Sequence, residues 1–596
     1  MSKICFVQKC PSNVNYDKQF QVSGADVFNL SSTKVTRLLK KDVDLVIGGE
    51  GFCPEDYDWV ILVGSEALKM FTKATAVTDY TGKVAPSKPE YKDCKFIASI
   101  SPAALAFKPE TRPVFEATVL NVHKIMSGNT PDSKEGDYQY FYTETQAFKQ
   151  HLHALVDSEV HTIALDTETS ALAARDGYLL GVSLSYKVGQ GIYAHADCID
   201  QDCIELMQKL LDAKTTVLHN AKFDMHFLTY HFNLQFLGRD IQDTMIMHYL
   251  LDERQGTHGL KGLTMKYGGL GDYDRELDEY RGEYCKQHGI KREDFTYDLF
   301  PWDVIKVYAC KDTDATLALF EKFNPLLQAN PKLYSCYTEM MLPALHLLTK
   351  MEDRGVPISK ARLDFSKELL TKELEELQTE LYSYKEIVEL EAMQGAPFKA
   401  GSVKQLRILL FDLLGLSPTG KLTGTGAIST DAEVLKELAD QHKIPALILD
   451  IRQKTKLKNT YIDKLLPAID KDNRVRTGFN LTSTTSGRLS SSGKFNMQQL
   501  PRDNPLIKGC VKAPEGYKIV AVDLSTAEVY YAAVLSGDRN MKQIFINMKA
   551  DPKKYPDFHS SVAHMVFNLK CLPSEVKKLF PALRQAAKAI TFGIDI

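Results

Sequence analysis

Several features that would assign this chain to a broad class are missing. The eleven cysteines are scattered along 596 residues without a Cys-x-x-Cys pair, which favours reduced intracellular thiols. His195, Cys198 and Cys203 cluster loosely, and we favour ordinary core and loop residues over a zinc site. No apolar run is long enough to span a bilayer, and the first residues lack the pattern of a signal peptide. We therefore expect a cytoplasmic protein without membrane association.

The chain also lacks an excess of one charge. Lysine and arginine number 73 against 76 aspartates and glutamates, a net charge of −3, so the global charge does not indicate a nucleic-acid partner. Carboxylates that hold metals can offset basic residues that hold phosphates, so the local distribution decides. The hydrophobic fraction of 44% is typical of a globular protein, and the length predicts several domains.

One polar, turn-rich segment divides the chain and predicts a linker at 127–136. We expect an α/β domain at 1–126, a region of alternating strands and helices at 137–330, and a third region at 331–596.

The first region contains two apolar strands, expected at 58–65, where the strand enters a helix, and at 96–100. Ser101-Pro102 follows the second strand. This unit resembles the second half of a uracil-DNA glycosylase-type domain, which carries a His-Pro pair at that point. Because Ser101 replaces the histidine, we expect a docking or structural role and no catalysis.

The apolar strand 162–168 ends in two acids, Asp166 and Glu168. Positions two apart on a strand point to the same face. Two carboxylates on one face repel each other unless a cation lies between them, and hard divalent cations prefer such oxygen ligands. An isolated Asp-x-Glu would be a weak signal.

Two further segments strengthen the prediction of a metal site. Residues 217–224 carry Asn220 and Asp224, and residues 307–312 carry Tyr308 and Asp312. Each pair is four apart, so each occupies one helical face. The four acids could hold two metals and the tyrosine could orient water, the set that two-metal phosphodiester hydrolysis needs.

These segments resemble the three motifs of the 3′–5′ proofreading exonuclease domain in family A DNA polymerases, over about residues 140–325, and Asp243-Thr244 follows the second motif as in that family. The resemblance implies a ribonuclease H-like fold, a mixed sheet with flanking helices. It implies two Mg²⁺ ions per site, with Mn²⁺ as a possible substitute, and an attacking water positioned by Tyr308. The metal ligands implied are Asp166, Glu168, Asp224 and Asp312. Residues 271–297 look like an added loop or small subdomain to which we assign no chemistry.

The third region opens with one long helix, expected at 361–392. Residues 402–412, 429–435 and 451–461 resemble the thumb of family A polymerases. Four basic residues within seven positions could follow a phosphate backbone, and a solvated helix face is the alternative. These include the DNA-binding candidates Lys454, Lys456 and Lys458.

A segment rich in small hydroxyl residues, 484–491, lets the backbone approach nucleic acid closely, and Arg488 can reach a groove acceptor or a phosphate. By resemblance, Arg488 contacts the primer–template DNA. Ser486 replaces the threonine of the family pattern.

An expected strand at 518–522 ends in Asp523 and resembles the first palm motif of the same family. By that resemblance Asp523 ligates two Mg²⁺ ions and Glu528 lines the sugar pocket. The pattern departs from the family at Thr526 and Tyr530, which puts contacts on the template side in doubt. His559 matches a family histidine that meets the phosphates of the incoming dNTP.

The last helix spaces Arg584, Lys588 and Phe592 four apart, along one stripe. The two cations can hold a triphosphate and the ring can stack on a base. By resemblance this is the fingers helix that closes on a dNTP. Only Asp595-Ile596 follow it, and no His-Asp-Glu tripeptide occurs in the chain.

The resulting interpretation is the N-terminal part of a phage-like family A DNA polymerase, acting in DNA replication. The fold class is multidomain α/β and α+β: a small α/β N-terminal domain, a ribonuclease H-like exonuclease domain and an incomplete right-hand polymerase domain with thumb, part of the palm and part of the fingers. We expect DNA hydrolysis by the chain alone, and DNA synthesis with a second polypeptide that carries the rest of the fingers and palm.

Other interpretations stay open. The chain's ending fits a split polymerase, an intervening sequence or a degenerate gene. The chain could also be a stand-alone 3′–5′ exonuclease with a defunct polymerase domain, or a non-catalytic DNA-binding scaffold subunit. If it is viral, its compartment is the host cytoplasm.

Overall fold

The computed structural model describes residues 3–8, 16–21, 26–29, 53–74, 77–102, 105, 111–126, 136–267, 270, 273–417, 420–423, 426–501, 504–524 and 526–594. The chain forms two compact units, Met1–Val511 and Lys512–Ile596. Of the expected linker 127–136, only Gly136 lies inside the described residues. None of the described helices combines the length and the apolar character that crossing a membrane requires.

The first unit begins with a five-stranded sheet in the order β2-β1-β3-β5-β4, parallel except for β4. Its strands are β1 Ile4–Gln8, β2 Asp26–Asn29, β3 Trp59–Val63, β4 Val84–Ala85 and β5 Phe96–Ser99. Helices α3 (Ser65–Phe71) and α5 (Arg112–Met126) pack on it through separate apolar clusters, so its central strands are buried on both faces. Both expected strands are confirmed, and Ser101-Pro102 follows β5.

A six-stranded mixed sheet follows, in the order β11-β10-β7-β8-β9-β6. Its strands are β6 Asp137–Tyr142, β7 Thr162–Thr169, β8 Leu179–Ser185, β9 Gln190–His195, β10 Thr215–Leu218 and β11 Ile241–Asp243. The central strand β7 pairs with β10 in parallel and with β8 antiparallel. This is the mixed sheet with flanking helices that the resemblance to the exonuclease domain implies.

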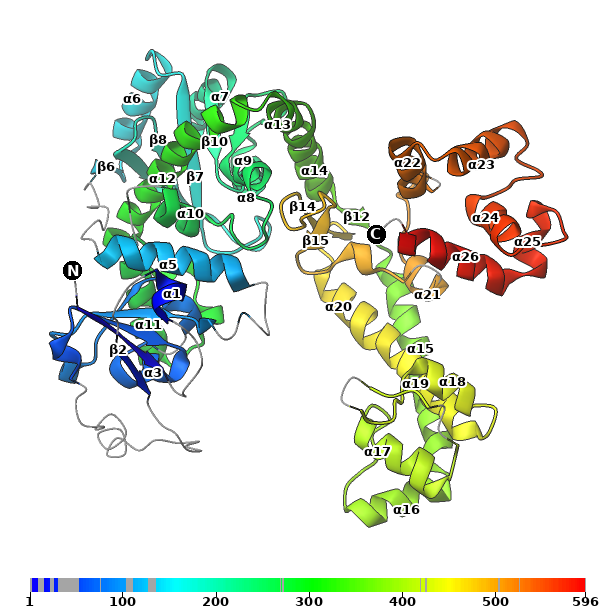
Figure 1. The fold of residues 1–596 in the computed structure, drawn as a ribbon. Helices are drawn as coiled ribbons and strands as arrows, with labels where there is room; N and C mark the ends of the chain where they lie inside the picture. The colour runs from blue at the N-terminus through cyan, green and yellow to red at the C-terminus, as the bar shows by residue number, and fades with distance from the viewer. Residues whose placement is uncertain are drawn as a thin grey trace. The chain divides into compact units, whose positions relative to one another are not determined.

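Helices cover this sheet (Figure 1). They are α6 Thr145–Val156, α7 Gln201–Ala213, α8 Lys222–Phe232, α9 Thr244–Leu251, α10 Leu260–Tyr267, α11 Arg275–His288 and α12 Trp302–Gln328. The long α12 crosses β7, β8 and β9. It approaches closely because Gly191 of β9 has no side chain, and a Cβ there would lie 2.6 Å from the Cβ of Cys310.

The later part of the first unit is mainly helical. It contains α13 Pro331–Ser335, α14 Leu342–Arg354, α15 Lys360–Tyr382, α16 Lys385–Gln394, α17 Val403–Arg407, α18 Ala432–Leu438 and α19 Lys443–Lys456. Helices α15 and α19 lie side by side (Figure 1). The single helix expected at 361–392 is wrong: α15 ends at Tyr382, where the hydroxyl of Ser383 bonds the carbonyl of Glu380, and α16 starts afresh after Tyr384.

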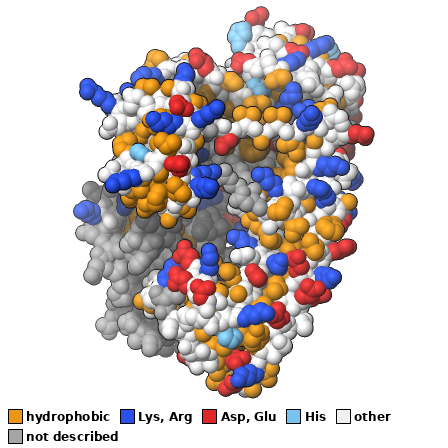
Figure 2. All heavy atoms as spheres, turned by 90° about the vertical axis from the view of Figure 1, so that its right-hand side faces the viewer, with side chains coloured by type: hydrophobic (Ala, Val, Ile, Leu, Met, Phe, Trp, Pro, Cys, Tyr) orange, Lys and Arg blue, Asp and Glu red, His pale blue; other side chains and the backbone are white. Residues whose placement is uncertain are grey.

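Two small antiparallel pairs complete this unit, β12 (Val356–Pro357) with β13 (Arg474–Val475) and β14 (Gly478–Asn480) with β15 (Ser490–Ser492). On the face drawn in Figure 2, lysine and arginine side chains are interspersed with acidic ones, in keeping with the balanced charge of the chain.

The second unit has five described helices: α22 Ala527–Ser536, α23 Arg539–Ala550, α24 Phe558–Val566, α25 Pro573–Leu579 and α26 Pro581–Ile594. The strand expected at 518–522 is wrong, because residues 518–524 are exposed and have no regular structure. A strand needs a neighbour for its backbone hydrogen bonds, and the described part of this unit contains no strand to pair with.

Candidate active site

Three carboxylates meet at the centre of the mixed sheet. Asp166 and Glu168 come from β7, and Asp312 comes from α12, which crosses that strand. One oxygen of each lies within 4.8 Å of the others. Glu168 is 4% exposed and Asp312 is 7% exposed. The alternation of β7 and the packing of α12 therefore bring together three of the four acids expected to bind metal.

Burial makes this arrangement costly without a cation. It raises the pKa of Asp166 and of Glu168 well above the ordinary range, and the neighbouring carboxylates raise both pKa values further. The ammonium of Lys261 opposes this shift at both acids. A divalent cation would do the same more strongly, because it carries twice the charge.

The residues present fit such a cation. Glu168 Oε1 is buried and has no hydrogen-bond partner among the described residues. Such unpaired buried oxygens are rare in native proteins. The donors of Asp166, Glu168 and Asp312 are all carboxylate oxygens, the ligands that Mg²⁺ and Mn²⁺ prefer.

The fourth acid, Asp224 on α8, lies beside this group. Its Oδ1 accepts hydrogen bonds from the Thr167 N–H at 2.9 Å and the Thr167 hydroxyl at 2.7 Å. Thr167 lies between the two site acids along β7, so these bonds hold Asp224 close to that strand. Its charge still raises the pKa of Asp166, and burial raises the pKa of Asp224 itself to about 7.

A second buried acid holds the turn that leads to α8. Asn220 has a φ of 63°, in the left-handed region. The carboxylate of Asp243 accepts the N–H groups of Asn220 at 3.3 Å and Ala221 at 2.9 Å, and it caps α9 through Met245 N–H at 2.8 Å. Asp243 therefore holds the turn from which α8, the helix that carries Asp224, begins.

Tyr308 lies one helical turn before Asp312 and is 9% exposed. Burial raises its pKa well above the ordinary value, so its hydroxyl stays protonated. The Nζ of Lys261 lies 4.1 Å from the centre of its ring.

Two contacts to Asp312 were not predicted. Lys261 on α10 and Tyr273, just before α11, both donate to Asp312 Oδ1. Tyr273 belongs to the 271–297 segment, so that segment contributes to the site. Neither residue belongs to one of the three motifs, and the Asp- and Tyr-rich composition of the segment was the only signal that the sequence offered.

A second group of predicted residues meets in the other unit. Helices α24 and α26 lie side by side (Figure 1) and carry His559, Arg584, Lys588 and Phe592. The rings of His559 and Phe592 lie 5.8 Å apart, and Lys588 Nζ lies 5.9 Å from the Phe592 ring. Burial lowers the pKa of His559, and the nearby charges of Arg584 and Lys588 lower it further.

Asp523 is not part of that group. It is exposed, and no hydrogen bond or ion pair within residues 504–524 and 526–594 joins it to His559, Arg584 or Lys588. Glu528 lies in the first turn of α22.

Known proteins match nearly the whole chain. A family described as DNA polymerase family A matches residues 366–595, and one described as 3′-5′ exonuclease matches residues 139–328. The DNA polymerase of Escherichia phage T5 is 54% identical over 99% of this chain and 70% of that protein. The chain belongs to the family A DNA polymerases.

Other family A polymerases are more distant and longer. DNA polymerase I of Pseudomonas aeruginosa is 30% identical over 78% of this chain, which spans 49% of that protein. The DNA polymerase of Bacillus phage SP01 is 27% identical over 90% of this chain and 64% of its own length. A solved structure, the POL domain of Pol1 from M. smegmatis in complex with DNA primer-template and dNTP, has a TM-score of 0.56 at 24% identity, over 76% of this chain and 71% of that chain. That likeness shows a shared fold.

The candidate DNA-binding residues of this polymerase family member lie at the end of α19, just after it, and between β14 and β15. Lys454 pairs with Glu373 at 2.5 Å and Lys458 with Asp463 at 2.8 Å, so both charges are partly neutralised. Lys456 is exposed at the end of α19. Arg488 is exposed in the turn between β14 and β15.

A cavity of about 300 Å³ lies within the first unit, between residues 172–230 on one side and residues 352–494 on the other. Its lining includes Leu172, Phe223 and Tyr230 from the earlier part of the chain, and Thr477 and Lys494 from the later part. Leu172 follows β7 and is 92% exposed. The cavity therefore lies between α8, the residues that follow β7 and the β14–β15 pair, and none of the acids Asp166, Glu168, Asp224 and Asp312 lines it.

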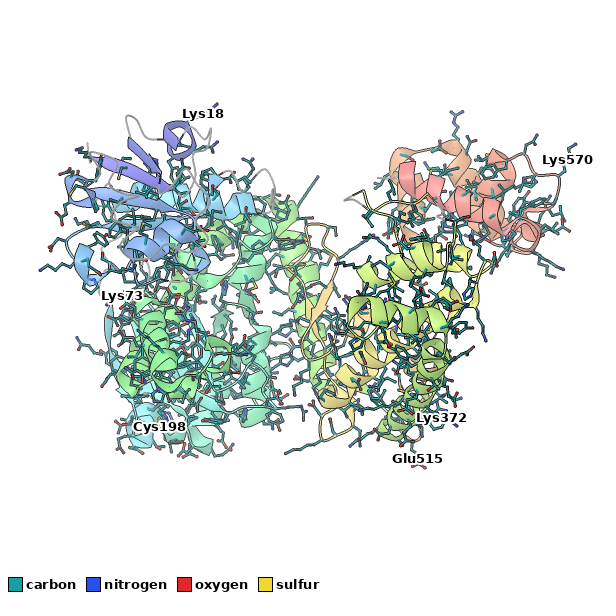
Figure 3. The ribbon with its side chains drawn as sticks, turned by 90° about the horizontal axis from the view of Figure 1, so that it is seen from below. Lys18, Lys73, Cys198, Lys372, Glu515 and Lys570 are labelled. Atoms are coloured by element: carbon teal, nitrogen blue, oxygen red, sulfur yellow. The ribbon has the colours of Figure 1, made fainter. Side chains whose placement is uncertain are left out.

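The zinc alternative receives no support from the geometry. Cys198 (labelled in Figure 3) and Cys203 are buried, and burial raises the pKa of each thiol to about 11. His195 Nδ1 accepts the N–H of Asp197 at 3.2 Å. Within the part of the chain that the structure describes, only Asp166, Glu168 and Asp312 converge as a possible metal-binding group.

Proposed function

We propose that this chain removes nucleotides from the 3′ end of DNA at the site formed by Asp166, Glu168 and Asp312, using two Mg²⁺ ions that Mn²⁺ can replace. The observation that carries the proposal is the convergence of three buried carboxylates, one with an unpartnered oxygen, inside the region that matches a 3′–5′ exonuclease family.

The residues of this site have separate roles in the proposed reaction. Asp166, Glu168 and Asp312 hold the cations, and Asp224 completes the ligand set from α8. When bound, the cations would supply Lewis-acid activation of water and stabilise charge on the phosphate. The protonated hydroxyl of Tyr308 orients the water that attacks the phosphodiester.

The cavity between α8 and the β14–β15 pair would hold a single DNA strand. The exposed side chains of Leu172 and Tyr230 offer apolar surface to bases, and Arg175 lies 4.8 Å over the Tyr230 ring. Lys494 lines the same cavity and pairs there with Asp176 at 2.7 Å, so a backbone phosphate would compete with that carboxylate for the ammonium.

A digestion assay tests the proposal. A single-stranded oligonucleotide labelled at its 5′ end should shorten stepwise with Mg²⁺ and stay intact with EDTA, and Asp166→Ala should remove the activity. The scaffold alternative requires the opposite, that wild-type and Asp166→Ala behave alike. Wild-type protein that leaves the DNA intact in Mg²⁺ and in Mn²⁺ would contradict the proposal.

A second candidate function is dNTP incorporation on a primer–template. It is supported by the meeting of His559, Arg584, Lys588 and Phe592 on α24 and α26, cations and a ring that suit a triphosphate and a base. Asp523 would hold Mg²⁺, Glu528 would line the sugar pocket, and Arg488 and Lys456 would contact the DNA.

Primer extension tests that function. The need for a second polypeptide stays a prediction, and extension by the chain alone would contradict it. Digestion without extension under any condition would favour the stand-alone exonuclease. Location in a host cytoplasm also stays a prediction.

A further inference from the structure

Lys261 places a positive charge inside the acid site. Its ammonium donates to Asp312 Oδ1 and, at 2.7 Å, to the hydroxyl of Tyr273. The same nitrogen lies 4.1 Å from the ring centres of Tyr273 and of Tyr308. The lysine therefore has two aromatic faces, one hydroxyl and one carboxylate around its charge.

These contacts hold the ammonium in one place. Asp312 is 7% exposed and Tyr273 is 8% exposed, and the Tyr273 hydroxyl also donates to Asp312 Oδ1. Ring faces attract a cation most strongly where water is excluded. A lysine that only packed its stem on the surface would extend its charge into solvent instead.

The 271–297 segment keeps Tyr273 in position. Leu277 and Cys285 of α11 are buried in one apolar cluster with Tyr273 and Tyr308. Phe300, after the segment, joins the same cluster. The segment therefore packs onto α12, and Tyr273 reaches the acid on that helix.

We propose that Lys261, held by Tyr273, is the internal counter-cation of the exonuclease site: it keeps Asp312 in place before metal binds, and a divalent cation must compete with it for that carboxylate. The inference rests on the proposed exonuclease function. Lys261 is a positioning residue that acts through Asp312. The same carboxylate oxygen cannot hold an ammonium and a divalent cation at full strength, because the two positive charges repel.

Metal binding measured directly tests the inference. Mn²⁺ should be titrated into the full chain by calorimetry, with Lys261→Met compared with wild type. Losing the competing charge should tighten Mn²⁺ binding about fivefold or more, the effect of one partly buried ion pair. The variant should also melt at a lower temperature in EDTA and gain more from Mn²⁺ than wild type does, because its carboxylates repel without a cation.

Matched variants separate this role from packing. Lys266→Met removes a lysine from the same helix whose ammonium lies 3.8 Å from Asp252 and 4.7 Å from the Tyr267 ring, so its Mn²⁺ affinity should equal wild type. Tyr273→Phe keeps the ring and removes the hydroxyl, so it should shift Mn²⁺ affinity in the same direction as Lys261→Met, but less. Tyr280→Phe, in α11, should leave it unchanged.

Three results decide the matter. Mn²⁺ binding to Lys261→Met that is unchanged or weaker overturns the inference, and so does an equal shift in Lys266→Met. If Lys261→Met does not fold, Lys261→Gln carries the same test, with a neutral polar group of similar reach. Wild-type protein that neither binds Mn²⁺ nor digests DNA would instead overturn the exonuclease function itself, so the two failures are distinguishable.

Discussion

The two candidate metal sites of this chain start from similar sequence and differ in what surrounds them. Asp166 and Glu168 end an apolar strand with hydrogen-bonded neighbours on both sides, and α12 brings Asp312 across it. Asp523 also follows an apolar run, yet it lies in an exposed segment without a strand partner among the described residues. An acid after an apolar run becomes a built site only where the run has neighbours to pair with.

Substituting the key acid in each region should separate the two sites most sharply. Asp166→Asn should lower the rate of Mg²⁺-dependent 3′ digestion by about 10³-fold or more, because a metal ligand supports several kcal/mol of charge stabilisation. Asp523→Asn should leave that rate within about twofold of wild type. The measurement is the single-turnover rate on a 5′-labelled single strand.

Asp197→Asn serves as the control, because this acid of the same domain has a side chain that is 92% exposed. Equal loss in Asp166→Asn and Asp523→Asn would remove the distinction between the regions. Loss in all three variants would point to a general effect of charge on DNA binding.

The same contrast explains what the sequence could predict. Strand alternation and helical spacing are local, so Asp166, Glu168 and Asp312 were predicted, and the structure brings them together. The contact of Lys261 and Tyr273 with Asp312 depends on how α10 and α11 pack on α12, and no local period encodes that packing. The strand before Asp523 was predicted wrongly because apolar composition gives a strand only where a neighbouring strand completes its hydrogen bonds.

The stability of the first unit should also depend strongly on its buried polar contacts. Glu352, 7% exposed, accepts from Lys222, from His226 Nε2 at 2.7 Å and from Phe479 N–H at 2.6 Å, and so joins α8 to α14 and β14. Glu352→Ala should lower the free energy of unfolding by about 3 kcal/mol, because it removes the buried carboxylate that the partly buried cations Lys222 and His226 share. Calorimetry of the full chain measures it.

The control removes an exposed ion pair. Glu293 pairs with Lys291 at 3.2 Å, and both side chains are more than 70% exposed, at 73% and 77%. Glu293→Ala should cost no more than about 0.5 kcal/mol. A similar cost for the two variants would mean that the junction around Glu352 is open to water.

The pH dependence of stability should report on His226, which belongs to the same group of contacts around Glu352. Burial opposes a charge on His226, but hydrogen bonds to Asp353 and Glu352 outweigh it and raise its pKa to about 9. Because the pKa is higher in the folded state than the ordinary 6.5, the stabilisation is complete below pH 6.5 and is lost as pH rises through about 9. The expected loss is at most about 3 kcal/mol.

His226→Gln isolates this contribution. The difference in unfolding free energy between wild type and His226→Gln should shrink steadily between about pH 6.5 and pH 9, measured by urea denaturation at each pH. A difference that stays constant over that range would show that His226 does not gain a proton on folding.

The smallest effect is expected in the second unit. Asp557 caps α24 through Ser560 N–H at 2.9 Å and pairs with Arg584 at 2.9 Å, with side chains that are 27% and 23% exposed. Asp557→Ala should cost about 1–2 kcal/mol, the sum of a helix cap and a partly buried ion pair, and Asp557→Asn, which can keep the cap, about half of that. Hydrogen exchange of the amides in α24 reports this local free energy directly. A cost of about 3 kcal/mol or more, as at Glu352, would mean that Arg584 is held as firmly as the cations around Glu352 are. The contrast between a built site and an exposed one would then apply to the segment around Asp523 alone, and not to the helices that carry His559 and Arg584.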